Sequence, residues 1–376
     1  MIRNGTGRSA PNVTSADEKD APDIKLIFVG PFPPPVHGQS LATAEFARIA
    51  KNYGILVRAC DTSGGNNKGL RAIAHRIVSH LQAFMKLLVC SKGPAYISVN
   101  ANAGAWATIF LICAARTRHR AIYLHHHTYG HIKSSSVIIQ LMQILSAKTT
   151  THIVLGDAMM VDLQKIIGAA ARVAVVNNSG LIDSAPYDIE KTTKNSIILG
   201  HLSNLVADKG IQQVIDVAIS ALQSGLNIHL VVAGPINDGV AEAAIAEASS
   251  VLGERFTYLG AISGTEKRRF FEDVDIFVFP SRYRNEASPL VLFEAMAAGI
   301  PCIATDLGCI RDAIGDEGGV VVGRSSDFKQ EALAFIQNVD GCLSAHRALA
   351  RRRFEYLLEQ HQQEIDQILQ SMRKSC

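Results

Sequence analysis

The sequence has few of the features that mark disulfide-bonded, secreted or membrane-spanning proteins. Its 376 residues contain no C-x-x-C pair and no Cys/His zinc spacing, although there are seven cysteines: Cys60, Cys90, Cys113, Cys302, Cys309, Cys342 and Cys376. We therefore predict neither a disulfide framework nor a structural zinc site. Residues 1–22 are polar and lack the apolar core of a signal peptide, and the longest apolar runs are too short to span a bilayer. These absences predict a cytoplasmic protein with a mobile tail over residues 1–22.

Acidic residues are missing from a long interval in the first half of the chain. Between Asp61 and Asp157 there is no Asp or Glu, whereas the interval carries ten basic residues: Lys68, Arg71, Arg76, Lys86, Lys92, Arg116, Arg118, Arg120, Lys133 and Lys148. Such a distribution favours an anionic partner. Residues 69–92 place apolar side chains at helical spacing with basic ones between them. This pattern suits a helix at the inner face of a membrane, and equally a core-facing helix with a solvated basic face.

Other partners and cofactors are disfavoured by missing motifs. No nucleic-acid-binding motif occurs and aromatic residues make up only 6% of the chain, so we expect no nucleic acid partner. The chain has no G-x-G-x-x-G and no G-x-x-x-x-G-K-[ST], which argues against a dehydrogenase and a P-loop ATPase. Gly38 instead stands between the first predicted strand and a helix, where a glycine lets a ligand approach the backbone closely; a plain surface loop is the alternative.

Short apolar runs rich in β-branched residues alternate with longer helical patterns, which is typical of an α/β protein built from βαβ units. Five runs begin at residues 24, 55, 95, 121 and 151, and five more begin at residues 196, 228, 255, 276 and 301. We therefore predict two Rossmann-like, doubly wound parallel sheets that face a cleft. The predicted division is a tail at 1–22, a first domain at 23–180, a linker at 181–196, a second domain at 197–350 and a final helix at 351–376.

Two glutamates bracket a predicted helix start in SRYRNEASPLVLFEAMAAG. Ser288 is predicted as the N-cap and Pro289 as the first helical residue, where a missing N–H costs nothing. The free N–H groups of Leu290 and Val291 would then favour an anion such as a diphosphate. Glu286 lies before the helix and Glu294 about 9 Å further along its axis. Ionised carboxylates there suit sugar hydroxyls, which are hydrogen-bond donors; a solvated glutamate and a capping glutamate are the alternative.

Three consecutive histidines, His125, His126 and His127, end the fourth predicted strand. Neighbouring residues on a strand point to opposite faces, and no carboxylate lies nearby in the sequence. We therefore predict no metal site here.

Four blocks in order resemble the donor-binding half of retaining, GT-B-type glycosyltransferases of family 4. These blocks are ILGHLSNLVADKGIQQVIDVA, LVVAGP, FTYLGAISGTEK and IFVFPSRYRNEASPLVLFEAMAAGIPCIATDLGCIRDAIG. The resemblance implies a GT-B fold, a nucleoside diphosphate sugar as donor, and a terminal helix that packs back onto the first domain. It also implies that no metal or other cofactor is needed.

The resemblance further implies roles for individual residues. The catalytic group would comprise His127 near the donor sugar, Lys209 on the diphosphate and Glu286 on the transferred sugar. The donor would also contact Gly38, Asn204, the backbone near Ile262, Ser288, Leu290 and Val291, with Glu294 on the ribose. The family commonly has an Arg five or six residues before the lysine, where this chain has Ser203 and Asn204. Arg282 or Arg284, both close to Glu286 in sequence, is the candidate substitute for this arginine; a solvated loop residue is the alternative for either.

The function predicted in this way is transfer of a sugar to a hydroxyl acceptor in surface polysaccharide or glycolipid assembly. The acceptor is expected to be lipid-linked or otherwise anionic, with peripheral membrane contact through the basic first domain. A sugar nucleotide 2-epimerase is the alternative enzyme, but it would need acid and base carboxylates in the interval that has none. A non-catalytic sugar-nucleotide-binding protein is the other alternative.

Overall fold

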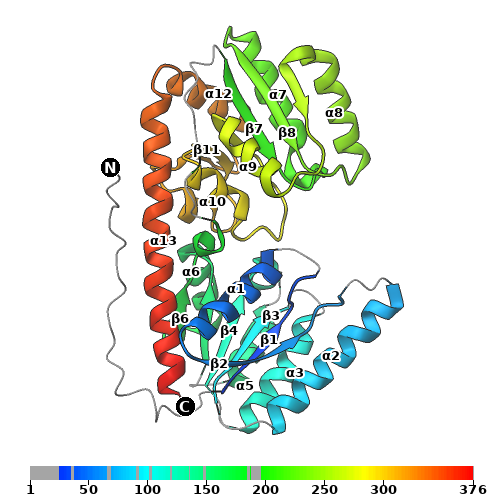
Figure 1. Ribbon diagram of the computed structural model, residues 1–376, viewed down its shortest axis with the longest axis vertical. Helices are drawn as coiled ribbons and strands as arrows, with labels where there is room; N and C mark the ends of the chain where they lie inside the picture. Colours follow the sequence, from blue (N-terminus) through cyan, green and yellow to red (C-terminus); the bar gives the residue numbers. More distant parts are fainter. Residues whose placement is uncertain are drawn as a thin grey trace, which may run out of the picture.

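The computed structural model describes residues 25–34, 38–65, 69–89, 93–100, 104–118, 121–134, 136–146, 150–183, 187 and 196–375. The predicted tail at 1–22 and most of the predicted linker at 181–196 lie outside these residues. Within them the chain forms two parallel six-stranded sheets flanked by helices, which confirms the predicted two-domain GT-B architecture (Figure 1).

The first sheet has the strand order β2-β1-β3-β4-β5-β6. Its strands are β1 (Lys25–Gly30), β2 (Leu56–Asp61), β3 (Ala95–Val99), β4 (Ile122–His126), β5 (Thr150–Val154) and β6 (Arg172–Val175). The helices of this domain are α1 (Gly38–Asn52), α2 (Gly69–Val89), α3 (Gly104–Thr117), α4 (Gly130–Ser134), α5 (Ser136–Ser146), α6 (Asp157–Ile167) and the 3-10 turn η2 (Asn178–Leu181).

The second sheet has the strand order β12-β11-β10-β7-β8-β9. Its strands are β7 (Ile197–Leu202), β8 (Ile228–Ala233), β9 (Phe256–Tyr258), β10 (Ile276–Phe279), β11 (Cys302–Thr305) and β12 (Gly319–Val322). The helices are η3 (Ala207–Lys209), α7 (Ile211–Gln223), α8 (Gly239–Leu252), η4 (Gly253–Arg255), α9 (Gly264–Asp273), α10 (Leu290–Ala297), α11 (Ile310–Ile314), α12 (Phe328–Val339) and α13 (Leu343–Lys374).

Two edge strands, β6 and β12, were not among the ten predicted strands. Each has only four residues and is paired on one side, so its side chains are mostly half-buried rather than buried. The strands β10 and β11 are equally short, but all their side chains are buried, so a half-buried edge strand gives a weaker apolar signal than a central strand of a parallel sheet.

Helix α13 runs along both domains (Figure 1). Its first half places Phe354 and Leu357 in a buried cluster with Phe293 of α10. Its second half places four residues, Ile365, Ile368, Leu369 and Met372, in the cluster under the first sheet. One helix therefore belongs to two hydrophobic cores.

A second connection between the domains is a helix cap supplied from a distance. No side chain of its own segment caps the N-terminus of α6. Instead the carboxylate of Asp312, on α11, accepts a hydrogen bond from the N–H of Ala158 at 2.8 Å. Burial raises the pKa of the Asp312 carboxyl, while this N–H lowers it. Gly156 makes the approach possible, because a Cβ there would lie 2.6 Å from Oδ2 of Asp312.

Replacing Leu369 with Ala should test the contribution of α13 to the first domain. Leu369 is fully buried, so its truncation leaves a cavity and should lower the free energy of unfolding by about 3 kcal/mol. Urea denaturation of the full chain measures this change. Gln370→Ala, on the exposed side of the same helix, is the control, and equal changes in both variants would contradict the packing described here.

Candidate functional site

The N-terminus of α10 lies in the second domain beside the two predicted glutamates. The helix starts at Leu290, one residue later than predicted, and the N-cap position is held by Pro289 with extended backbone at ψ 125°. The prediction that Ser288 caps the helix is therefore wrong: its hydroxyl is buried and has no hydrogen-bond partner among the described residues. Ser288 instead uses its carbonyl, which accepts from the side-chain amide of Asn178 at 2.8 Å across the domains.

Lys209 and Glu286, 77 residues apart, form an ion pair. Nζ of Lys209 lies 2.5 Å from Oε2 of Glu286, and the two side chains are only 19% and 11% exposed. The same Oε2 accepts a hydrogen bond from the hydroxyl of Ser281 at 3.0 Å. Nζ also lies 5.0 Å from the centre of the Tyr283 ring. A half-buried cation is thus held against a carboxylate beside the N-terminus of α10.

Two glycines allow close backbone packing around this pair. Gly210 has φ +78°, and a Cβ there would lie 2.4 Å from the carbonyl oxygen of Pro280. Gly308 has φ +62°, and a Cβ there would lie 2.6 Å from the carbonyl oxygen of Glu286. Both positions demand glycine on conformational and steric grounds. A backbone hydrogen bond from Arg282 to the carbonyl of Asp208, 2.7 Å long, joins the two loops directly.

Glu294 is paired with a lysine that sequence reasoning did not single out. Nζ of Lys267, on α9, lies 2.5 Å from Oε1 of Glu294. The sequence gives little indication of this pair, because 27 residues separate the partners and Lys267 stands within a run of charged residues. Both predicted carboxylates of the donor site are therefore neutralised by lysines from other elements.

His127 follows β4 in a loop that reaches the second domain. A Cβ at Gly130 would lie 2.1 Å from Oδ1 of Asn285, so this loop packs directly against the loop that carries Glu286. The structure thereby brings the His127 loop, the Lys209 turn and the start of α10 to one place between the sheets.

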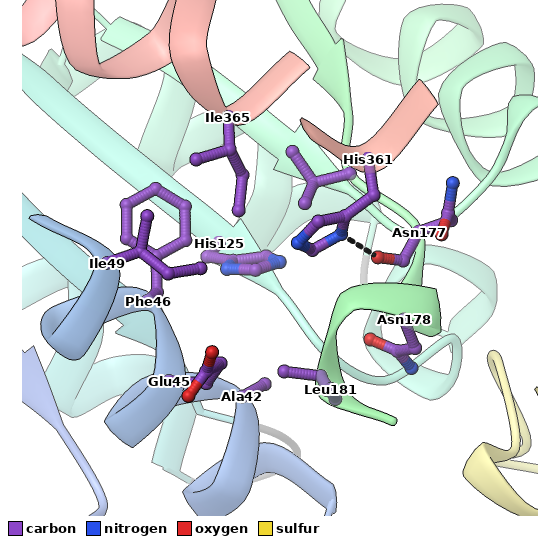
Figure 2. A pocket seen from close by; sticks show the side chains of 11 residues that line it. Ala42, Glu45, Phe46, Ile49, His125, Asn177, Asn178, Leu181, His361 and Ile365 are labelled. Carbon is purple, nitrogen blue, oxygen red and sulfur yellow. Dashed lines mark hydrogen bonds between the residues drawn. The ribbon is translucent and has the colours of Figure 1, made fainter. Parts of the chain in front are cut away.

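The neighbouring His125 faces a different, internal cavity of about 10 Å³, room for roughly one water molecule. Figure 2 shows His125 and His361 converging there from β4 and α13. Nδ1 of His125 is 2.6 Å from the hydroxyl of Tyr96, and Nδ1–H of His361 donates to the carbonyl of Asn177 at 2.7 Å. Burial lowers the pKa of both imidazoles, so these rings pack the domain junction in their neutral form.

Three further predicted residues, Gly38, Asn204 and Ile262, lie at more open positions. A Cβ at Gly38 would meet nothing within 4 Å, so the first turn of α1 borders open space. Asn204 is exposed. Ile262 lines a cavity of about 560 Å³ over the second sheet, together with Leu259 and Glu266.

His201 was not predicted as part of this region. It is fully buried next to the turn of Ser203, where its Nδ1–H donates to the carbonyl of Val278 at 2.8 Å and its Nε2 accepts from the Ser203 hydroxyl at 2.9 Å. Burial lowers the pKa of His201 to about 4. The ring therefore supports the turn as a neutral group and supplies no cation in place of the family arginine. Arg282 and Arg284 are both exposed.

The described part of the chain holds neither a metal-binding cluster nor a membrane-spanning helix. No group of three or more His, Cys, Asp or Glu side chains there could hold a metal ion. No helix in the same ranges is both long and apolar enough to cross a membrane.

Comparison with known proteins finds similarity to glycosyltransferases, mainly in the second domain. Residues 187–340 match the family model described as glycosyl transferases group 1. The chain is 27% identical over 141 residues to the capsular polysaccharide biosynthesis glycosyltransferase CapM of Staphylococcus aureus, covering 37% of this chain and 36% of CapM. It is 31% identical over 135 residues to the D-inositol 3-phosphate glycosyltransferase of Mycobacterium marinum, covering 35% and 28% of the two chains. The matches thus span well under half of these relatives.

Solved structures resemble the chain over nearly its whole length. Sucrose-phosphate synthase from Thermosynechococcus elongatus has a TM-score of 0.68 and 16% identity, covering 94% of this chain and 99% of its own. HepE from Anabaena, solved in complex with UDP, has a TM-score of 0.69 and 16% identity, covering 93% and 100% of the two chains. At this identity the likeness shows the fold.

The uncapped start of α10 leads to a prediction about Ser288. Because its hydroxyl is buried without a partner, Ser288→Ala should change the free energy of unfolding by less than about 0.5 kcal/mol, whereas loss of a true N-cap costs about 1 kcal/mol. Asp327 does cap α12, since its carboxylate accepts from the N–H of Lys329 at 3.0 Å, so Asp327→Ala should show the larger loss. Chemical denaturation compares the two variants. Equal losses of unfolding free energy would show that Ser288 does cap α10.

Proposed function

We propose that this chain, whose residues 187–340 match the glycosyl transferases group 1 model, is a retaining glycosyltransferase that uses a nucleoside diphosphate sugar. The observation that carries the proposal is the Lys209–Glu286 pair at the N-terminus of α10. It combines a half-buried cation, free helical N–H groups and a carboxylate within one set of loops. The structures of HepE with UDP and with UDP-glucose support a donor of this class.

The proposed donor binding follows from the charges at the site. The diphosphate binds Lys209 and the N–H groups of Leu290 and Val291, because the helix N-terminus carries partial positive charge. The donor sugar and ribose hydroxyls donate to Glu286 and Glu294, while the base lies against the backbone near Ile262. Binding therefore exchanges the partners of existing charges: Lys209 moves from a carboxylate toward a phosphate, and Glu286 receives hydroxyls.

The proposed reaction forms one C–O bond and breaks another at the anomeric carbon. The acceptor hydroxyl attacks on the face from which the diphosphate leaves, and a phosphate oxygen takes its proton. Lys209 and the start of α10 stabilise the negative charge that accumulates on the departing nucleotide. His127, carried on the opposite loop, completes the site from the first domain. We expect no metal requirement, because these groups supply the charge stabilisation.

The acceptor is proposed to bind the first domain in a cavity of about 780 Å³ at the carboxyl ends of β1, β2 and β3. Its lining combines polar side chains, among them Ser63, Arg76 and Asn100, with apolar ones such as Ile77 and Phe110. A lining that offers a cation, hydroxyl and amide groups and apolar surface suits an amphiphilic acceptor with an anionic head group. CapM and the lipopolysaccharide core mannosyltransferase LpsB of Rhizobium meliloti support a role in surface polysaccharide or glycolipid assembly.

The surface beside this cavity is proposed to dock on an anionic bilayer at the cytoplasmic face of the membrane. Large apolar side chains of α2 and α3 are exposed: Leu70, Ile73, Ile77, Val78, Leu81, Met85, Val89, Trp106 and Phe110. Such a patch exceeds the scattered apolar exposure of ordinary surfaces. Basic residues of α2 accompany it, and the absence of Asp and Glu between Asp61 and Asp157 removes any repulsion from anionic lipid head groups.

Donor-site variants test the transfer proposal. Lys209→Ala should lower kcat by about 100-fold or more, because a group that stabilises the leaving charge is lost. Glu294→Gln should instead weaken donor binding by about 10-fold with a small effect on kcat, because a charged hydrogen-bond acceptor becomes neutral. Transfer kinetics with a panel of UDP- and GDP-sugars, together with calorimetric donor binding, measure both.

Lys329→Ala and Glu331→Gln, both exposed on α12, are the matched controls for these variants. If Lys209→Ala and Glu294→Gln behaved like these controls, the assignment of the site would be wrong. Binding of no sugar nucleotide by the unmodified chain would contradict the proposed function itself.

A matched pair of apolar-to-acidic substitutions tests the membrane proposal. Ile77 on α2 and Val251 on α8 are 57% and 56% exposed. Ile77→Glu should weaken binding to vesicles of phosphatidylglycerol and phosphatidylcholine by about 10-fold, because an apolar contact is lost and a repulsive charge is added. Val251→Glu should leave vesicle binding unchanged. Vesicle sedimentation measures both, and equal behaviour of the two variants would contradict docking through α2.

A further inference from the structure

Three buried histidines of the first domain form a continuous hydrogen-bonded chain. Nε2 of His131 lies 2.8 Å from Nδ1 of His126, and Nε2 of His126 lies 2.9 Å from Nδ1 of His152. All three side chains are at most 1% exposed. The chain ends at Thr128 Oγ1, 3.0 Å from Nδ1 of His131, and at Gln143 Oε1, 2.9 Å from Nε2 of His152.

The hydrogen-bond acceptor at one end, Gln143, determines every proton position along the three histidines. The side-chain oxygen of Gln143 can only accept, so Nε2 of His152 carries the proton and its Nδ1 is a lone pair. Nε2–H of His126 must then donate to His152, and Nε2–H of His131 must donate to His126. The Thr128 hydroxyl donates to the remaining lone pair of His131. Three neutral rings in one tautomer therefore satisfy every buried nitrogen of the chain.

Burial keeps the three rings neutral. It lowers the pKa of His131 and of His152 to about 4, and it lowers the pKa of His126 well below its usual value, with the neighbouring imidazoles adding to the effect. A proton added to any ring would turn a required acceptor into a donor and break the chain.

The placement of the chain relates it to the site between the domains. His126 ends β4 and His131 lies in the first turn of α4, so their hydrogen bond closes the connection that runs from His127 to Gly130. His152 on β5 and Gln143 on α5 anchor the closed loop to the body of the first domain. The loop carries His127 and packs through Gly130 against Asn285, next to Glu286.

We infer that His131, His126 and His152 are positioning residues. They hold the His127 loop against the loop that carries Glu286, called here the donor loop, during glycosyl transfer. The inference rests on the proposed function for its kinetic consequence, but the hydrogen-bonded chain stands on the geometry alone. A misplacement of a catalytic group by about 1 Å lowers a rate by roughly 100-fold, so loss of the chain should affect kcat.

Two polar substitutions at His131 distinguish the effect of the hydrogen-bonded histidines from the effect of side-chain packing. The amide of Gln reaches the position of Nε2 and can still donate to His126, whereas the shorter amide of Asn reaches only the position of Nδ1. His131→Gln should keep kcat within about 3-fold, while His131→Asn should lower it by about 100-fold. Calorimetric affinity for the best UDP- or GDP-sugar should stay within about 3-fold in both, because the donor binds mainly to the second domain.

The corresponding pair at His346, on α13, is the control and should leave kcat unchanged. Equal kcat values for His131→Gln and His131→Asn would overturn the positioning role. Failure of the unmodified protein to transfer any sugar would instead contradict the proposed function, so the two failures can be told apart.

The tautomers of the unmodified protein provide a test that requires no activity and no folded variant. Long-range ¹⁵N–¹H correlation spectra of the histidine-labelled full chain at pH 7 should show His126, His131 and His152 all as neutral Nε2–H tautomers. An Nδ1–H tautomer or a protonated ring at any of the three positions would contradict the hydrogen-bonded arrangement described here.

Discussion

The arrangement of this molecule depends on the apolar stripe of α13, because that stripe is buried in both domains. Phe354 and Leu357 complete the core beside α10, and Ile365 and Leu369 complete the core under the first sheet. Each sheet could build most of its own core from its βαβ units, whereas α13 belongs to the cores of both domains and so fixes one relative to the other. The donor loop at Glu286 and the loop of His127 are brought together by this constraint.

The charges at the cleft are organised as exchangeable pairs. Lys209 with Glu286 and Lys267 with Glu294 each join a cation and a carboxylate from different elements. Burying one charge alone would be costly, whereas a pair is tolerated. A ligand that brings phosphates and hydroxyls together offers both members of a pair new partners, which is why this arrangement suits a sugar nucleotide better than a simple anion.

The sequence allowed much of this structure to be anticipated, for reasons that are local. Ten of the twelve strands and the two-sheet architecture follow from short apolar runs, and a helix starts within one residue of the predicted point before Glu294. The predictions failed where a distant group decides the outcome. Ser288 has the side chain of a good N-cap, yet its carbonyl is engaged by Asn178 and its hydroxyl is buried. The lysine partner of Glu294, the buried His201 and the cross-strand contacts of His126 and His152 depend equally on contacts that no spacing in the sequence reveals.

The capping of α6 by Asp312 has a consequence for motion between the domains. An ordinary N-cap is supplied by the residue before the helix and moves together with the helix. The capping hydrogen bond is then unaffected by movements of other parts of the protein. Here the cap belongs to the other domain. Widening the cleft withdraws an acceptor from the first turn of α6 and leaves a half-buried carboxylate without this donor. Opening of the two domains and fraying of α6 are therefore one event, and the free energy of a helix end becomes part of the energy that holds the cleft closed.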